Sequence, residues 1–265
     1  NMGAETGATT SVFPSDEVTL DFMCSVGRGK QWVHLVADED ARYDEVIEIN
    51  LSRLVPLIAK PHSPGNVVPV SEVEGKKVDQ VCVGSCTNSS FKDLMTAAFM
   101  LKGKRVKQGV SLTISPGSMA VYHNLAEHGY LADLIAAGAR ILECTCGPCI
   151  GQGQAPGSNA VSVRTFNRNF MGRSGTADAQ IYISSVETAI SCALTGVITD
   201  PRSMGELREI PMPRELKMQT ALIVEPPDQQ EAKAVKIVRG PNIKPIELRG
   251  ELPENVEGHV LIKLE

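Results

Sequence analysis

The stretch Gln80-Val81-Cys82-Val83-Gly84-Ser85-Cys86-Thr87-Asn88-Ser89 decides the fold, because an apolar run ends there in a loop of small residues that carries a cysteine. Residues 80–84 have the pattern of a buried strand, and residues 91–101, which follow the loop, have that of a helix. The same alternation continues, with strands predicted at 111–115, 140–144 and 179–184 and helices at 118–130, 131–137 and 186–195. Strands that alternate with helices predict an α/β fold, with layered, mostly parallel sheets flanked by helices.

Composition divides the chain into three expected parts. Pro56, Pro61, Pro64 and Gly65 break the pattern, so we expect one α/β domain over residues 56–205. Residues 1–55 are expected to be part of another α/β subdomain, with a helix that Ser15 caps and that runs to Val26, and with strands at 33–38 and 45–50. Residues 206–265 are rich in Pro, Glu and Lys and are expected to form an irregular segment and linker.

Three cysteines are the candidate metal ligands. Cys86 lies in the first loop, and Cys146 and Cys149 form a Cys-x-x-Cys pair around Gly147 and Pro148. Soft thiolates select iron–sulfur clusters, zinc or copper(I). A Cys-x-x-Cys pair also occurs in redox dithiols and in half of a zinc site, but a second pair and an H-x-x-x-H motif, which a zinc site would favour, are not in the sequence. A cubane cluster held by only three cysteines leaves one iron open to act as a Lewis acid.

Three of the remaining cysteines are expected to be core residues. Cys82 and Cys144 lie in strand-like apolar runs, and Cys192 lies in a helix-like one. Free cysteine is among the most frequently buried residue types. We therefore predict that these three do not join the ligand set, with Cys144 as the nearest rival because it lies close to Cys146.

Four segments together resemble the aconitase family. Gly84-Ser85-Cys86-Thr87-Asn88-Ser89-Ser90 and Cys146-Gly147-Pro148-Cys149-Ile150-Gly151-Gln152 are similar to its two cluster-binding motifs. Asn1-Met2-Gly3-Ala4-Glu5-Thr6-Gly7-Ala8-Thr9-Thr10 resembles the entry to its second domain, and Thr165-Phe166-Asn167-Arg168-Asn169-Phe170-Met171-Gly172-Arg173 resembles its arginine-bearing substrate loop. The resemblance implies the fold of the aconitase iron–sulfur domain and a 4Fe-4S cluster with Cys86, Cys146 and Cys149 as ligands and one open iron.

The resemblance also implies residues for the substrate. Arg168 and Arg173 match family arginines that contact it, with Asn167 beside them, and guanidinium forks grip carboxylates bidentately. Asn1 and Glu5 match residues near the open iron. We expect Asn88 and Ser118 to cap helices rather than to touch a ligand. No catalytic residue is predicted in this chain, because the family's base is a serine of its mobile C-terminal domain.

The resemblance further implies that the family's N-terminal and C-terminal domains are missing partners of this chain, and that the chain alone is inactive. We expect aconitate hydratase, a lyase of the tricarboxylic acid cycle that interconverts citrate and isocitrate through cis-aconitate, with a tricarboxylate as substrate. A sister enzyme, the large subunit of an isopropylmalate or homoaconitate dehydratase, is the alternative. An RNA-binding regulator in the apo state is the alternative of another class.

Charge, hydropathy and cysteine content limit the partners and the cellular compartment that the sequence allows. A formal net charge of −5 makes a nucleic-acid partner unlikely, which disfavours the regulator. No apolar run approaches about 18 residues, so we predict no membrane span. Seven cysteines without the density of a disulfide scaffold indicate a reducing compartment. We expect the cytoplasm, with the mitochondrial matrix as the other compartment compatible with these features.

Overall fold

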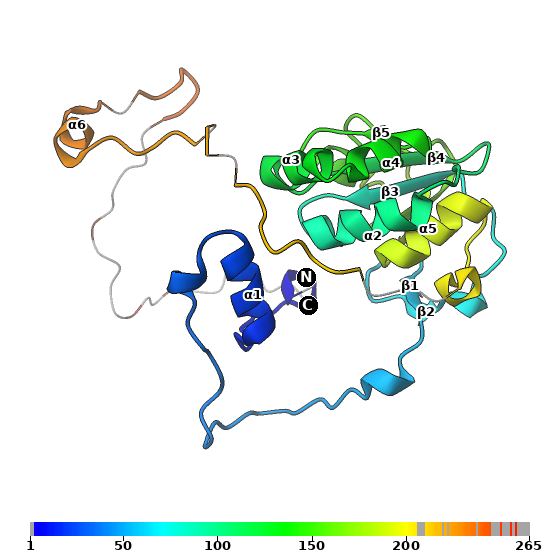
Figure 1. The fold of residues 1–265 in the computed structure, drawn as a ribbon, viewed down its shortest axis with the longest axis horizontal. Coiled ribbons are helices and arrows are strands. Elements are labelled where there is room, and N and C mark those ends of the chain that lie inside the picture. Colours follow the sequence, from blue (N-terminus) through cyan, green and yellow to red (C-terminus); the bar gives the residue numbers. More distant parts are fainter. Residues whose placement is uncertain are drawn as a thin grey trace. The chain divides into compact units, whose positions relative to one another are not determined.

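A computed structural model describes residues 3–205, 210–218, 220–221, 223–236, 238–244, 250, 255 and 258. Within them, seven strands form one sheet in the order β2-β1-β7-β6-β3-β4-β5. The strands are β1 Leu57–Ala59, β2 Val67–Pro69, β3 Gln80–Gly84, β4 Ser111–Ser115, β5 Arg140–Ile141, β6 Val161–Arg164 and β7 Gln180–Ser184. Strands β3 to β7 pair in parallel, whereas β1 pairs antiparallel with β2 and β7. The predicted α/β class with a mostly parallel sheet is therefore confirmed (Figure 1).

Helices pack against one face of this sheet. They are α2 Phe91–Leu101, α3 Met119–Glu127, α4 Tyr130–Ala136 and α5 Val186–Thr195. Helix α2 contacts the other three, and α5 contacts β3 and β6. Alternate strand residues such as Val81, Ile114 and Val163 point into the apolar core that these helices close, as the period of two in a strand requires.

The opposite face of the sheet is more polar. It presents Gln80, Cys82, Ser162 and Arg164, all of which are buried. Cys82 forms a small separate cluster there with Cys149 and Phe166, which come from the loops beyond the strands. Loops rather than helices therefore bury this face around the predicted site.

Local signals explain where the helices begin. The hydroxyl of Ser90 accepts a hydrogen bond from the Asp93 backbone N–H, and the Asp93 carboxylate accepts one from the backbone N–H of Ser90, a capping box that starts α2. Ser118 caps α3 as predicted. Helix α1, Glu17–Ser25, is capped by Asp16 and not by Ser15. Ser15 instead forms an isolated bridge with Leu35.

Two predicted strands of the N-terminal part are wrong. Residues 33–38 and 45–50 are not strands, apart from the single bridge at Leu35. This part holds α1 and the short 3-10 helices Gly3–Thr6, Gly29–Gln31 and Leu51–Arg53. A strand forms only when a neighbouring strand provides hydrogen-bond partners for its backbone N–H and C=O groups. In the described part of the chain, no strand of the sheet lies beside residues 45–50 to provide them.

Three of the strands were not predicted from the sequence, and a fourth strand was predicted to be longer than the observed one. The first two, β1 and β2, lie in the proline-rich break, and the third is β6. Strand β5 ends at Ile141, so Cys144 lies beyond it in a bend, contrary to the prediction that the strand runs to residue 144. The remaining 3-10 helices are Val70–Glu72, Gly147–Ile150 and Pro201–Met204.

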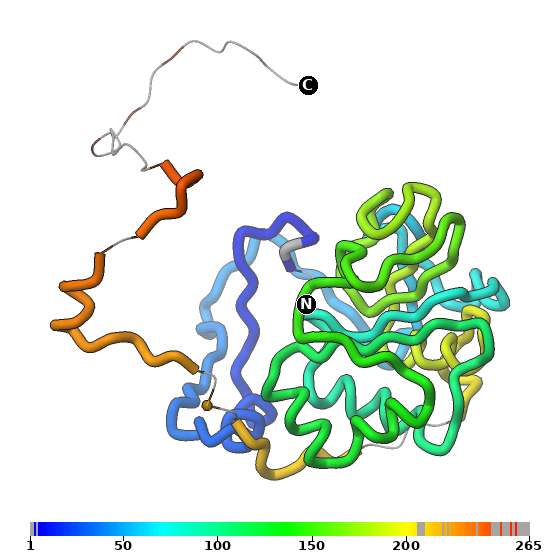
Figure 2. Tube along the Cα trace, turned by 90° about the horizontal axis from the view of Figure 1, so that it is seen from above, coloured from blue at the N-terminus to red at the C-terminus, as the bar shows by residue number. Residues whose placement is uncertain are grey.

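The chain forms two compact units, residues 1–220 and residues 221–265. In the described part of the second unit, helix α6 spans Gln229–Ala234 and is drawn in orange in Figure 2. Asp228 caps this helix. The expected boundaries near residues 56 and 206 stay predictions. No helix in the described ranges has the length and apolarity that crossing a bilayer requires.

Candidate cluster- and substrate-binding site

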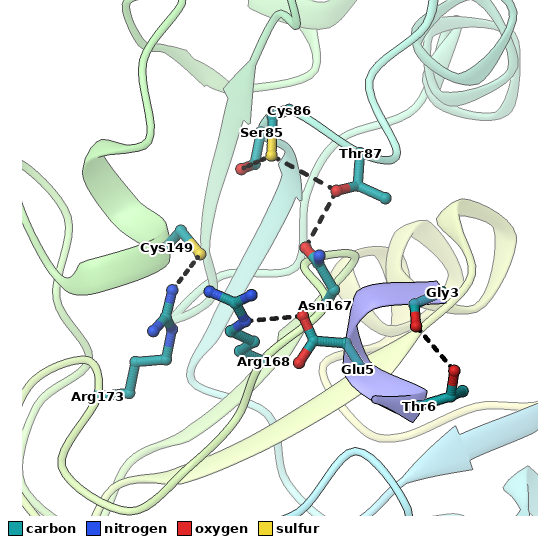
Figure 3. Close-up of polar contacts among 10 residues, drawn as sticks. All are labelled: Gly3, Glu5, Thr6, Ser85, Cys86, Thr87, Cys149, Asn167, Arg168 and Arg173. Carbon is teal, nitrogen blue, oxygen red and sulfur yellow. Dashed lines mark hydrogen bonds and ion pairs between the residues drawn. The ribbon is translucent and has the colours of Figure 1, made fainter. Parts of the chain in front are cut away.

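The predicted motifs follow parallel strands at one edge of the sheet. Cys86 comes two residues after β3, Cys146 and Cys149 follow β5, and Arg168 follows β6. Strand β6, which was not predicted, is what brings the arginine loop to this edge. Carboxyl ends of parallel strands form the usual ligand crevice of such sheets. In Figure 3, the side chains of Cys86, Cys149, Arg168 and Arg173 point toward one common space.

A sharp turn presents Cys86. Gly84 has φ of +120°, and a Cβ atom there would lie 2.0 Å from the carbonyl oxygen of Ser115, so only glycine fits. Ser85 also has a positive φ, of +72°. Its backbone N–H donates to the Ser115 carbonyl at 3.0 Å. The chain therefore leaves β3 abruptly, and the exposed Cys86 projects from the edge of the sheet.

Neighbouring hydroxyl groups surround the Cys86 thiol. Thr87 Oγ1 lies 3.5 Å from the sulfur and Ser85 Oγ lies 3.9 Å from it. The hydrogen bond with Thr87 is the main cause that lowers the pKa of the Cys86 thiol. Thr87 Oγ1 also donates to Asn167 Oδ1 at 3.1 Å. The first cysteine loop is thus joined to the arginine loop.

Cys146 and Cys149 occupy the short helix Gly147–Ile150. The Cys146 thiol is exposed, and negative charge on the nearby Cys86 is the main cause that raises the pKa of Cys146. The Cys149 thiol is buried, and Arg173 Nη2 donates to its sulfur at 3.4 Å. The three thiols therefore lie near enough to act on one another's charge, and a guanidinium lies beside Cys149.

Arg168 is paired in this structure. Its Nε donates to Glu5 Oε1 at 2.7 Å, and the Glu5 side chain is only 10% exposed. Two residues that the resemblance places near the substrate thus meet each other. Asn1, the other residue expected there, lies outside the described residues.

Polar side chains hold the arginine loop in place. Asn169 is fully buried, and its Nδ2 donates to the carbonyl oxygens of Lys60 at 2.7 Å and Ile181 at 3.2 Å. Asn88 does not cap α2, contrary to expectation, because Ser90 does. The Asn88 side chain donates instead to the carbonyl oxygen of Thr165, at the start of the arginine loop.

The other cysteines differ in their burial. Cys82 and Cys192 are fully buried, as predicted, and burial raises the pKa of Cys192 to about 11. Cys144 is only partly buried, which contradicts its expected place in the core. Its thiol lies 3.8 Å from the sulfur of Met119. Met119 is the first residue of α3, so the Cys144 thiol is directed toward that helix.

The donor set suits an iron–sulfur cluster by its chemistry. Three soft thiols lie near Arg173, whose buried Nε has no hydrogen-bond partner among the residues that the structure describes. Such a donor matches the sulfides and thiolates of an anionic cluster. Among the described residues, no three His, Cys, Asp or Glu side chains stand in metal-binding geometry, so the ligand set stays a prediction.

Comparison with known proteins gives one family and a set of relatives. The model of the aconitase family (aconitate hydratase) matches residues 1–77 and 71–196. A protein of Archaeoglobus fulgidus named 3-isopropylmalate dehydratase large subunit 2 is 43% identical over 203 residues, 76% of this chain and 49% of its own. One of Methanopyrus kandleri with the name 3-isopropylmalate dehydratase large subunit 1 is 44% identical, over 76% of this chain and 48% of its own.

A third relative has a different substrate in its name. The 2,3-dimethylmalate dehydratase large subunit of Eubacterium barkeri is 42% identical over 76% of this chain and 48% of its own length. The chain therefore spans about half the length of the curated relatives it matches. These names overturn the expectation of aconitate hydratase, and with it of citrate and the tricarboxylic acid cycle. The four segments that resemble the aconitase family did not separate these substrates.

Proposed function

The chain belongs to the aconitase family, and on that premise we propose that it forms the cluster- and substrate-binding part of a hydro-lyase of the 3-isopropylmalate dehydratase type. The observation that carries the proposal is that the Cys86, Cys146 and Cys149 thiols lie near one another and that Arg173, from the arginine loop, donates to Cys149. The names of the relatives favour a hydroxy dicarboxylic acid, an alkyl-substituted malate, as substrate.

The three thiols are the proposed protein ligands of a 4Fe-4S cluster. When bound through three cysteines, such a cluster supplies an open iron that is a Lewis acid for the hydroxyl group to be removed. Arg173 donates to Cys149 and lies where it balances the negative charge of thiolate ligands. The hydroxyl of Thr87 lowers the pKa of the Cys86 thiol, which favours the thiolate that a metal needs.

Arg168 is the residue proposed to bind a carboxylate group of the substrate. Its guanidinium binds Glu5 through Nε and is 41% exposed, so its other N–H groups remain accessible to a ligand. A carboxylate of the substrate would compete with Glu5 for this fork. Asn167, which lies beside Arg168 in the loop, accepts a hydrogen bond from Thr87 in the first cysteine loop.

Further polypeptide is part of the proposal. The relatives are named large subunits, and the chain spans about half of their length. A general base is not assigned to any described residue, because the site offers only Glu5 as a carboxylate and that group is engaged with Arg168. We propose that the working enzyme completes the site with further domains or a second subunit.

Metal loading tests the ligand set. The full protein is reconstituted anaerobically with iron and sulfide, and bound iron, sulfide and visible absorbance are measured. We expect Cys86→Ser, Cys146→Ser and Cys149→Ser each to lose stable loading, since one ligand is removed from three. Cys24→Ser, at an exposed cysteine, is the matched control and should load like the wild type. If one of the three test variants bound a full complement of iron and sulfide, the cysteine replaced in it would not be a cluster ligand.

Substrate assays on the complete enzyme test the reaction. Formation of the unsaturated product is followed with 3-isopropylmalate, 2,3-dimethylmalate and citrate, and we expect turnover of an alkyl malate. Arg168→Lys should lower kcat/KM roughly 10- to 100-fold, because a point charge replaces a two-pronged donor. Arg105→Lys, at an exposed arginine outside the site motifs, is the control. Turnover of citrate alone would overturn the proposed substrate class.

A further inference from the structure

Arg164 is a fully buried arginine beneath the site that the motif analysis did not single out. It ends β6 on the polar face of the sheet and is 1% exposed. Its Nε donates to Ser162 Oγ at 2.8 Å, and its Nη2 donates to Gln80 Oε1 at 2.9 Å. Its Nη1 donates to the carbonyl oxygen of Pro148 at 2.7 Å and to Ser174 Oγ at 2.9 Å. Every nitrogen of the guanidinium is thus hydrogen-bonded.

Two of these partners belong to the loops of the proposed site. Pro148 lies between Cys146 and Cys149, and Ser174 directly follows Arg173. Ser174 Oγ also donates to the Pro148 carbonyl oxygen at 3.3 Å. One guanidinium therefore holds the Cys-x-x-Cys turn and the end of the arginine loop against each other and against the sheet.

The positive charge of Arg164 has no carboxylate beside it. Among the described residues, no ion pair of Arg164 occurs, and the ionisable groups close enough to act on its charge are the thiols of Cys82 and Cys149. The ring of Phe166, which packs against both cysteines, lies 5.6 Å from the guanidinium carbon. A buried charge without a partner of opposite sign is costly. An anion above the Cys-x-x-Cys turn would remove that cost.

We propose that Arg164 is a positioning residue of the cluster site, which fixes the Cys146–Cys149 turn through Pro148 and stabilises the negative charge of the thiolate-bound cluster from below. The inference rests on the proposed function, since it needs a cluster on Cys149. It assigns a role to a side chain that touches neither substrate nor metal. Fixed outer partners of this kind commonly determine how tightly a metal site holds its metal.

A purely structural role makes a different prediction. It would lower the stability of the chain in any Arg164 variant but would leave the electronic properties of a loaded cluster unchanged. A nearby positive charge stabilises the reduced cluster, which carries one more negative charge, and so raises its reduction potential. The potential therefore separates the two roles.

The test uses R164Q, which removes the charge, and R164K, which keeps it but loses the fork. The full protein is reconstituted anaerobically, and iron content, the rate of cluster loss to a chelator and the reduction potential by voltammetry are measured. We expect R164Q to lose its cluster roughly tenfold faster or more, and to show a more negative potential. R164K should restore the potential while still losing the cluster faster than the wild type, because Lys cannot hold Pro148 and Ser174 together.

R140Q is the matched control. Arg140 also donates to the loop after the cysteines, at the carbonyl oxygen of Gly153 and at Gln154, but it is exposed. It should leave the potential and the loss rate unchanged. A loaded R164Q protein with the wild-type potential and loss rate would overturn this inference alone, whereas a wild-type protein that holds no cluster would overturn the proposed function with it. Should R164Q not fold, a wild-type rate of cluster loss in R164K would still overturn the positioning role.

Discussion

Two regions of the chain have similar strand-like sequences but opposite outcomes. In the sheet domain, residues 57–204, Val81 and Val163 are completely buried in paired strands. In the N-terminal segment, residues 7–55, Val46 is 78% exposed and Ile47 is 76% exposed, in a stretch that pairs with no strand of the described chain. The difference teaches that apolar alternation prepares a segment for pairing, and that only a neighbouring strand with free backbone groups completes it.

The residues that begin helices act in the same way in both regions. Asp16 begins α1 in the N-terminal segment and Ser90 begins α2 in the sheet domain, each by accepting a backbone N–H three residues ahead. A cap satisfies groups within its own turn, so it needs no distant partner. The two regions therefore differ in their long-range contacts and not in their local chemistry.

The largest expected effect is a glycine exchange at the end of β3. Gly84→Ala should lower the free energy of unfolding of the sheet domain by about 4 kcal/mol, because it combines a strained φ with a clash against Ser115. The same change at Gly27 in the N-terminal segment, where φ is +73° and nothing lies within 4 Å, should cost only about 1 kcal/mol. Urea unfolding of both variants measures this, and equal losses would remove the distinction between the regions.

Leucine truncations should show the next largest difference. Leu94 is fully buried in α2, and Leu94→Ala should cost about 3 kcal/mol through lost packing and a cavity. Leu51 is 75% exposed in the N-terminal segment, so Leu51→Ala should change the free energy of unfolding by less than about 0.5 kcal/mol. A large loss at Leu51, seen in the same denaturation experiment, would mean that this segment is packed in solution.

The smallest expected effect concerns the helix caps. Ser90→Ala should destabilise the sheet domain by about 1 kcal/mol, because the capping box of α2 is lost. Asp16→Ala should speed amide hydrogen exchange at Thr19 without shifting the unfolding transition of the sheet domain. The Thr19 backbone hydrogen bond lowers the pKa of Asp16, so this protection should be present above the usual carboxyl range and fade as pH falls through the lowered pKa. A shift of the unfolding transition of the sheet domain in Asp16→Ala would mean that α1 and the sheet unfold together.

Much of the sheet domain could be predicted from the sequence. The bounds of β3, α2, β4 and α5 agree with their predicted ranges, because each combines a clear period with a start or stop signal. Strand β6 was missed, since Val161-Ser162-Val163-Arg164 ends in a charged residue and carries a serine. That pattern suits a strand with one apolar face and one polar face, but four residues are too few to separate it from a loop.

The site divides in the same way. From the sequence alone, the resemblance to the aconitase family predicted Cys86, Cys146, Cys149, Arg168 and Arg173 as site residues, because its motifs are formed by residues that are neighbours in the chain. Only the tertiary structure decided that β6 brings the arginine loop there, that Glu5 binds Arg168, and that Arg164 is buried under the Cys-x-x-Cys turn. The physical reason is that burial and charge pairing depend on residues far apart in sequence, such as Gln80 and Arg164, whereas motifs and caps are formed by residues that are neighbours in the chain.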